Sequence, residues 1–197
     1  FEPQDECMEE LNESAQKFLN TGSTYINHIA AGNKSNESAQ FFTHDINTGV
    51  SGFNKINMQS QDSLDLEKLD KENGEKKLEY EKTINHVREV PLMRLDDYIE
   101  NHDSLIDSIN LLKIDTQGFE PEVLDGFGKK LEIVDVVLTE LMFYDFYERS
   151  LSFSDIEKYL LKANFQLYDI SHIAKNPMNG RTDWVDVIYV NQRILKK

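Results

Sequence analysis

The sequence predicts an α/β protein with one doubly wound, mostly parallel sheet that helices cover on both faces. Three observations support this class. Apolar, strand-like runs alternate with helical patterns along the chain, which is typical of a parallel sheet. The stretch LLKIDTQGFEPEVLDG, residues 111–126, passes from a buried strand through a tight turn into a helix. The run IVDVVLTEL, residues 133–141, is nearly continuous in apolar, mostly β-branched residues, as central parallel strands are.

The first half of the chain is expected to combine one helix with several short strands. Met8, Leu11 and Ala15 fall near helical spacing, which predicts a helix over 4–19 that stops before Gly22. The next elements expected are strands at 25–31, 40–43 and 87–93, a polar turn at 33–38, a loop at 47–61 and a helix at 95–102. The charge-dense stretch 62–82 is expected to be a solvated insert without chemistry.

The second half is expected to continue the alternation and to close with an antiparallel pair. Strand 110–115 leads into helix 120–125, which Gly126 ends, and strand 133–141 follows. Ser154 and Glu157 form a capping box that opens a helix running to Ala163, and Asn164 supplies the left-handed residue after it. The last two strands, 165–170 and 184–191, pair across a connection at 171–183.

Composition limits the class of protein and its partners. The 197 residues are enough for one domain, 1–197, and 39% of them are hydrophobic. No apolar stretch approaches the roughly 20 residues that cross a bilayer, so no membrane partner is expected. The net charge of −15 repels phosphate backbones, so no nucleic-acid partner is expected either. The single cysteine, Cys7, and the lack of a recognisable signal peptide lead us to expect a cytoplasmic protein.

Acidic and amide side chains follow the strand 110–115 directly. Asp115 stands at its carboxyl end, where α/β proteins bind ligands, and an acid there is costly unless it is solvated or paired. Gly118 permits a tight turn and close approach of a ligand. Gln117 and Glu120 belong to the same turn, and Glu120 also complements the dipole of the following helix. We therefore favour a functional role for Asp115 over a structural one.

Two further acids are candidates. Glu2 comes at the front of a helix and after an expected strand end, the position that binds ribose hydroxyls in nucleotide-binding domains. A solvated terminal acid is the alternative interpretation. Glu140 is expected one strand away from Asp115, where two carboxyl groups can share a ligand or a proton. A surface glutamate paired with lysine explains Glu140 equally well.

Metal and nucleophile patterns are missing from the sequence. The five histidines lack metal-ligand spacing, and one cysteine excludes a zinc framework, although a metal bound by carboxylates stays open. No nucleophile elbow or phosphate-binding loop is present. The aromatic run FYDFY, residues 143–147, is consistent with an acceptor pocket or with a hydrophobic lid or core.

Several motifs occur together in one order along the chain. They are FEP followed by a helix, HIAAGN, MRLDDYI, LLKIDTQGFEPEVLDG, VVLTEL and NFQLYDI. In this order they resemble the FkbM family of S-adenosylmethionine-dependent methyltransferases. The most specific element is KIDTQGFE, residues 113–120, which matches the family pattern K-I-D-x-[EQ]-G-x-E. The resemblance covers the chain apart from the insert 62–82.

The resemblance implies a Rossmann-like methyltransferase fold and S-adenosylmethionine as cofactor. It implies methyl transfer to a hydroxyl oxygen of a sugar, a glycan or a small metabolite. Carried onto this chain, Glu2 would hold the cofactor ribose, and Ala30 and Ala31 would lie near the adenine. Asp115 and Gln117 would face the methyl group and the acceptor. As general base, we expect Asp115 first and Glu140 second.

The chain departs from the family at its front. The family's first strand and Gly-rich loop should precede Phe1, and the strand should lie between the strand that ends near Glu2 and the one that ends at Asp115. We therefore expect an N-terminally incomplete domain with unpaired central strand edges. As an isolated polypeptide it should bind the cofactor weakly or not at all and show no turnover. Two other functions stay open: a Rossmann-fold oxidoreductase and a non-catalytic binding module.

Overall fold

The computed structural model describes residues 1–17, 23–45, 47–60, 83–102 and 105–195. The α/β class is confirmed, since the described chain contains both helices and strands, mixed along the sequence. The N-terminal half contains α1 (Met8–Gln16), β1 (Ala30–Ala31), β2 (Glu37–Thr43), β3 (His86–Met93) and α4 (Leu95–Asn101). The C-terminal half contains β4 (Ile109–Ile114), α5 (Glu120–Phe127), β5 (Val134–Met142), α6 (Phe153–Leu160), β6 (Phe165–Lys175), β7 (Thr182–Asn191) and α7 (Gln192–Leu195).

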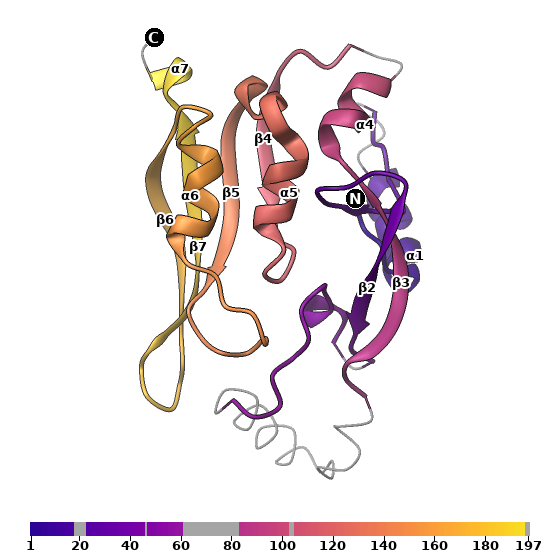
Figure 1. Ribbon diagram of the computed structural model, residues 1–197, viewed down its shortest axis with the longest axis vertical. Helices are drawn as coiled ribbons and strands as arrows, with labels where there is room; N and C mark the ends of the chain where they lie inside the picture. Colours follow the sequence, from indigo (N-terminus) through magenta and orange to yellow (C-terminus); the bar gives the residue numbers. More distant parts are fainter. Residues whose placement is uncertain (18–22, 46, 61–82, 103–104, 196–197) are drawn as a thin grey trace.

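The strands form two sheets, which Figure 1 shows side by side. One has the order β1-β3-β2 and the other the order β4-β5-β7-β6. Within the described residues, β4 has only β5 as a strand neighbour and β1 has only β3.

The expectation of a mostly parallel sheet is wrong for the described strands. β1 pairs with β3 and β4 pairs with β5 in parallel, while the other three ladders are antiparallel. The β2–β3 hairpin was not foreseen because its strands are separated by residues 44–85, so no short turn marks it. The closing antiparallel pair β6–β7 is confirmed, with a shorter connection than expected.

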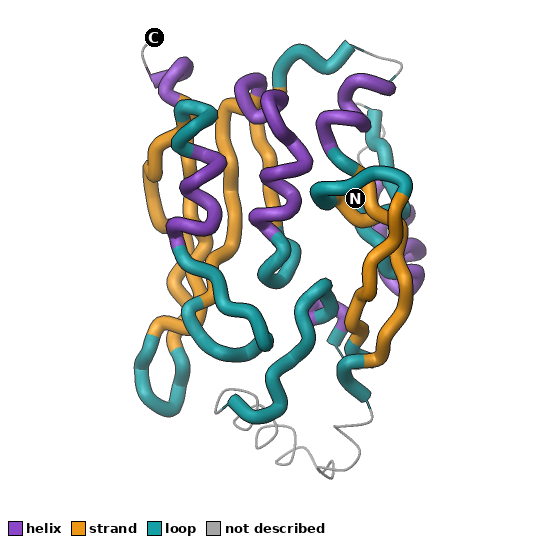
Figure 2. Tube along the Cα trace, in the orientation of Figure 1, coloured by secondary structure: helices purple, strands orange, loops and turns teal. Residues whose placement is uncertain are grey.

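The helices α5 and α6 pack on the same face of the four-stranded sheet, as Figures 1 and 2 show. On that face of β5, the side chains of Val137, Thr139 and Leu141 are fully buried. On the opposite face, Leu111 of β4 is 57% exposed. Cover on both faces is therefore not found among the described residues, and the main core lies between α5, α6 and the strands.

Local signals explain most element boundaries, with two corrections. The helix α6 begins two residues earlier than expected, because Ser152 and Asp155 make the reciprocal capping bonds in place of Ser154 and Glu157. Gly126 does not end α5; it lies inside the helix, where a Cβ would overlap the carbonyl of Gly32. Gly126 therefore permits close packing of α5 on the turn after β1, and the helix ends at Gly128, which has φ +50°.

Other boundaries differ by a few residues. The predicted strand 25–31 is reduced to β1, because only Ala30 and Ala31 have ladder partners on β3. The helix expected over 4–19 is observed as a 3₁₀ turn at Asp5–Cys7 followed by α1, and its predicted end lies outside the described residues. The insert 62–82 also lies outside them. None of the described helices is long and apolar enough to span a bilayer.

Candidate functional site

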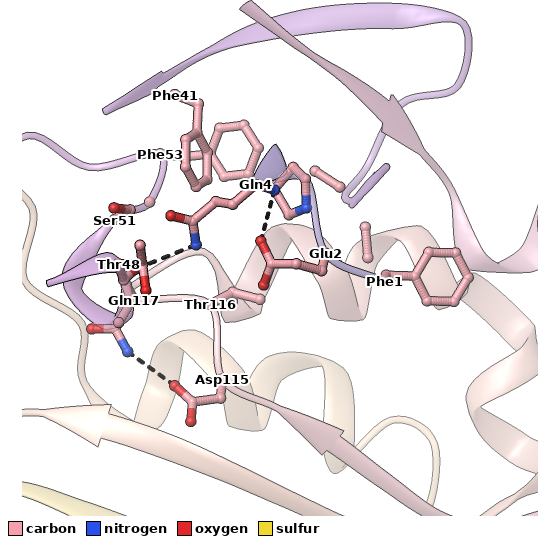
Figure 3. A pocket seen from close by; sticks show the side chains of 15 residues that line it. Phe1, Glu2, Gln4, Phe41, Thr48, Ser51, Phe53, Asp115, Thr116 and Gln117 are labelled. Atoms are coloured by element: carbon pink, nitrogen blue, oxygen red, sulfur yellow. Dashed lines mark hydrogen bonds between the residues drawn. The ribbon is translucent and has the colours of Figure 1, made fainter. Parts of the chain in front are cut away.

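A cavity of about 260 Å³ lies between the N-terminal segment, β1, the loop after β2 and the turn after β4. All five residues predicted to contact a cofactor line it: Glu2, Ala30, Ala31, Asp115 and Gln117. Figure 3 shows Glu2, Asp115 and Gln117 around this cavity. They come from three distant parts of the sequence. The fold therefore brings together the positions that the sequence motifs single out.

Glu2 is held in the cavity by backbone contacts. Its amide donates to the carbonyl of Asn27 at 3.0 Å, which ties the N-terminal segment to the stretch before β1. Its side-chain Oε1 accepts from the amide of Gln4 at 2.8 Å. Within the described residues Oε2 makes no hydrogen bond. One carboxylate oxygen is therefore fixed, and the other is available to a ligand.

Gln4 is a second polar side chain on this wall, and the sequence did not single it out. It is 6% exposed, and its Nε2 donates to the carbonyl of Thr48 at 3.3 Å. Its Oε1 is buried without a hydrogen-bond partner among the described residues. A buried acceptor without a donor is costly, so Gln4 Oε1 suits a ligand donor at this site.

Asp115 follows β4 and has a fixed orientation. Its Oδ2 accepts from Lys113 Nζ at 3.0 Å, and its Oδ1 accepts from Gln117 Nε2 at 3.0 Å. The carboxylate in turn raises the pKa of the Lys113 ammonium, because the charged form gains this hydrogen bond. Each carboxylate oxygen still has a free lone pair, so Asp115 can accept a proton or a hydrogen bond from a ligand.

Glu120 organises the turn that carries Asp115. It is 1% exposed, and its Oε1 accepts from the amide of Thr116 at 2.9 Å, the hydroxyl of Thr116 at 3.1 Å and the amide of Gly118 at 3.2 Å. Burial raises the pKa of the Glu120 carboxyl, and these bonds oppose that effect. Beyond its place in the first turn of α5, Glu120 thus holds the turn in shape.

Glu140 lies beside Asp115, as predicted, because Ile114 and Thr139 are opposite each other on β4 and β5. It does not line the first cavity. It lines a smaller one, with Gly118, Glu120, Met142, Tyr144, Tyr147, Arg149 and Leu151. Burial, then the charges of Asp115, Glu120 and Asp186, raise the pKa of Glu140 to about 8. Glu140 is therefore largely protonated at neutral pH.

The aromatic run 143–147 contributes to a hydrophobic core, one of the two alternatives that the sequence left open, whereas an acceptor pocket stays a prediction. Phe146 and Tyr147 belong to a small core with Ile56 and Ile84. Tyr147 also lines the cavity that contains Glu140. Tyr147 therefore belongs both to this core and to the wall of that cavity.

The remaining wall of the first cavity comes from the loop after β2, at Thr48–Gly49 and Ser51–Phe53. Phe53 stacks on Phe119 with ring centres 4.1 Å apart. The loop composition predicted an irregular segment but not its position, which depends on the tertiary path. No group of three or more acidic, histidine or cysteine side chains suited to a metal occurs in the described part of the chain.

A second, mainly apolar cavity of about 390 Å³ adjoins the first. The two share Phe1, Ala31, Asp115 and Thr116, and the second extends between β4 and α4. Ligand sites in proteins commonly have volumes of about 300–1,000 Å³. The adjoining cavities therefore provide room for a ligand of cofactor size.

These features define an α/β protein with a ligand-sized cleft and an oriented carboxylate at the end of a strand. The family model described as "Methyltransferase FkbM domain" matches residues 1–167. The chain belongs to the FkbM methyltransferase family. Comparison with the curated proteins gave no match, and comparison with solved structures gave none either.

Proposed function

We propose that the protein transfers a methyl group from S-adenosylmethionine to a hydroxyl oxygen of a carbohydrate or small metabolite. The proposal is carried by one observation. The five positions that the family motifs assign to the cofactor line a single cavity, and the oriented Asp115 carboxylate stands at its wall. When bound, the cofactor supplies an electrophilic methyl group on a sulfonium, which is a good leaving group.

The residues of the cavity suit the two ends of a nucleoside. Glu2 has one carboxylate oxygen fixed by Gln4 and one oxygen open, an arrangement that can accept hydrogen bonds from ribose hydroxyls. Gln4 Oε1 needs a donor, and a hydroxyl would supply one. Phe53 and Phe41 contribute an apolar wall of the cavity, against which an adenine ring can pack.

Asp115 is proposed as the general base. An acceptor hydroxyl must lose its proton as its oxygen attacks the methyl carbon, and a carboxylate within hydrogen-bond reach can take that proton. Lys113 and Gln117 each occupy one lone pair of Asp115 and leave the others for the acceptor. Because the displacement needs little more than alignment, positioning of the hydroxyl supplies much of the rate enhancement.

Glu140 is proposed to assist rather than to act as base near neutral pH. Its pKa of about 8 keeps it protonated there, so it can donate a hydrogen bond to an acceptor oxygen. It would become a second base only at higher pH. Of the two neighbouring carboxyl groups, Asp115 thus accepts the proton and Glu140 donates a hydrogen bond.

The charge around the site favours a neutral acceptor over an anionic one. A negative charge at Glu140 is repelled by three nearby carboxylates, those of Asp115, Glu120 and Asp186. Of the nearby cations, Lys113 is already engaged by Asp115, and Arg149 by Glu122. A hydroxyl on an uncharged sugar or metabolite avoids this repulsion.

The cofactor is tested by thermal unfolding of the natural polypeptide that contains residues 1–197. The melting temperature is measured with increasing S-adenosylmethionine or its demethylated product. A saturable rise is expected, because a ligand that binds the folded state stabilises it. Glu2→Ala should abolish the rise, while Glu10→Ala, an exposed acid on α1, should preserve it.

Transfer itself is tested with deuteromethyl-labelled cofactor and a panel of neutral sugars, polyols and carboxylic acids, read as a mass gain. Label on hydroxyl compounds supports the proposal. Label on carboxylic acids alone would contradict the proposed acceptor class. No melting shift and no label in a cooperatively folding protein would replace the proposal with a non-catalytic binding module.

A further inference from the structure

We propose that Tyr147 is a positioning residue for the reaction: through Gln117 it fixes the orientation of Asp115. The inference rests on the proposed function of Asp115 as the base. Tyr147 neither lines the first cavity nor stands near Asp115 in sequence, and the aromatic run 143–147 that contains it gives no sign of this role. Its role follows from a chain of side-chain contacts.

The chain has two links. The Tyr147 hydroxyl lies 2.9 Å from Gln117 Oε1, and Gln117 Nε2 donates to Asp115 Oδ1 at 3.0 Å, the second link being drawn in Figure 3. The single Tyr147 proton is shared between Gln117 Oε1 and the carbonyl of Val50, and where it is directed at Oε1 it favours one orientation of the Gln117 amide. The reversed amide would turn an oxygen toward the Asp115 carboxylate and lose the donor. Tyr147 thereby secures the hydrogen bond that Asp115 receives.

The hydroxyl also joins this turn to the wall of the cavity. It lies 2.8 Å from the carbonyl of Val50, in the loop after β2. The loop that carries Tyr147 also pairs with the segment that follows this wall, because the Asn57 amide donates to the carbonyl of Phe146 and the Glu148 amide to that of Lys55, both at 2.8 Å. One hydroxyl therefore contacts the two segments that must keep their spacing for a cofactor and a base to meet.

Gln117 is the residue that most needs such support. Its φ of +55° is left-handed, which is uncommon for a residue other than glycine. Its carbonyl accepts from Asn54 Nδ2 at 3.0 Å, so the backbone is held from one side and the side chain from the other. Strained residues persist where surrounding contacts determine them, and they concentrate at functional sites.

Tyr147 itself is unsuited to proton transfer. It is 3% exposed, and burial raises the pKa of its hydroxyl above the usual value. The hydroxyl therefore stays protonated and keeps its one proton for the two acceptors beside it, Gln117 Oε1 and the carbonyl of Val50. A positioning role follows, rather than a role as acid or base.

The experiment compares Tyr147→Phe, Gln117→Leu and the double variant in the deuteromethyl-transfer assay. Each single variant is expected to lower kcat by about 10- to 100-fold, because small misplacement of a catalytic group is costly. KM for S-adenosylmethionine should stay nearly unchanged in Tyr147→Phe and rise in Gln117→Leu, because only Gln117 lines the cofactor cavity. The double variant should lose no more than Gln117→Leu, since both act through one chain of contacts. Tyr168→Phe, a 63% exposed tyrosine on β6, is the control and should retain full kcat.

Full kcat in a cooperatively folding Tyr147→Phe variant would overturn the inference, as would losses that multiply in the double variant. A second measurement needs no turnover. Thermal unfolding of the wild type, the two single variants and the double variant gives a double-mutant cycle, in which we expect the effects on stability of Tyr147→Phe and Gln117→Leu to be non-additive. Additive effects of the two substitutions on stability would contradict the contact between Tyr147 and Gln117, even if methyl transfer is observed. Coupling without any cofactor-dependent stabilisation or transfer by the wild type would contradict the proposed function and, with it, the catalytic role of Tyr147.

Discussion

Asp115 and Glu140 lie side by side across the parallel strands β4 and β5, because Ile114 is paired with Thr139 one residue earlier. The two carboxyl groups differ in their surroundings. Asp115 is exposed and receives donors from Lys113 and Gln117, whereas Glu140 is half-buried with Oε1 unpaired among the described residues. Neighbouring acids in unlike environments are a common basis for separate proton-transfer roles.

The raised pKa of Glu140 predicts a loss of stability with rising pH. Its carboxyl titrates at about 8 in the folded chain against an ordinary value of 4.5. Between these values the folded state holds more protons than the unfolded state, so the free energy of unfolding falls as pH rises. The melting temperature of the wild type should decline across this window, and Glu140→Gln should decline less.

The measurement is thermal unfolding between pH 5 and pH 9, with Glu132→Gln, an exposed acid, as control. The control should follow the wild type. Equal slopes for Glu140→Gln and the wild type would show that Glu140 does not carry the dependence.

Replacing Asp115 by Asn should reduce turnover by roughly 10²–10⁴-fold if it is the general base. The amide keeps the shape of the side chain but cannot take the acceptor proton. Cofactor affinity and melting temperature should change far less than kcat, as single-turnover methyl transfer and calorimetry would report. Asp107→Asn, an exposed acid before β4, is the matched control. Unchanged turnover in a folded Asp115→Asn protein would remove it from the mechanism.

Glu120→Ala should destabilise the fold more than Glu120→Gln. Alanine leaves the Thr116 and Gly118 donors without their acceptor, at about 1–3 kcal/mol for each buried group. Glutamine keeps an oxygen in place and removes the buried charge. Denaturant titration at 25 °C measures both free energies of unfolding, and equal losses for the two variants would contradict this role of Glu120.

Gly126→Ala should also destabilise, contrary to the usual effect in a helix. Alanine is ordinarily preferred over glycine there by about 1 kcal/mol. Here the added methyl group meets the carbonyl of Gly32, and overpacking of this kind costs about 1–3 kcal/mol. Denaturant titration would decide the sign, and a gain in stability would mean that α5 can move away from β1.

The sequence predicted elements whose evidence is local. The strand β5 was recognised from its unbroken apolar run, and α6 from its capping residues, although Ser152 and Ser154 both precede an acid by three positions. The turn at Asp115 was recognised because polar residues and Gly118 follow a hydrophobic strand. Such signals depend on neighbours within a few residues, so they survive without knowledge of the tertiary structure.

Features that depend on long-range contacts were missed. The pairing of β2 with β3 crosses residues 44–85, and Gln4, Ser51 and Tyr147 reach the site only through the tertiary path. Gly126 was interpreted as a helix end because its packing partner, Gly32, is distant in sequence. Asp115 and Glu140 could be named in advance because each stands at or near the end of a predicted strand. The residues that support them, such as Tyr147, have no local sequence pattern that predicts their position.

The walls of the cavity have a consequence for the order of folding. Asn54 and Gln117 are separated by 63 positions and Val50 and Tyr147 by 97, so each contact closes a long loop of chain. Closing long loops costs conformational entropy that nearby pairings, such as β6 with β7, avoid. The C-terminal hairpin is thus expected to acquire hydrogen-exchange protection early in refolding. The cavity is expected to form last in folding. The chain can therefore bind a ligand there only after segments that are distant in sequence have come into contact.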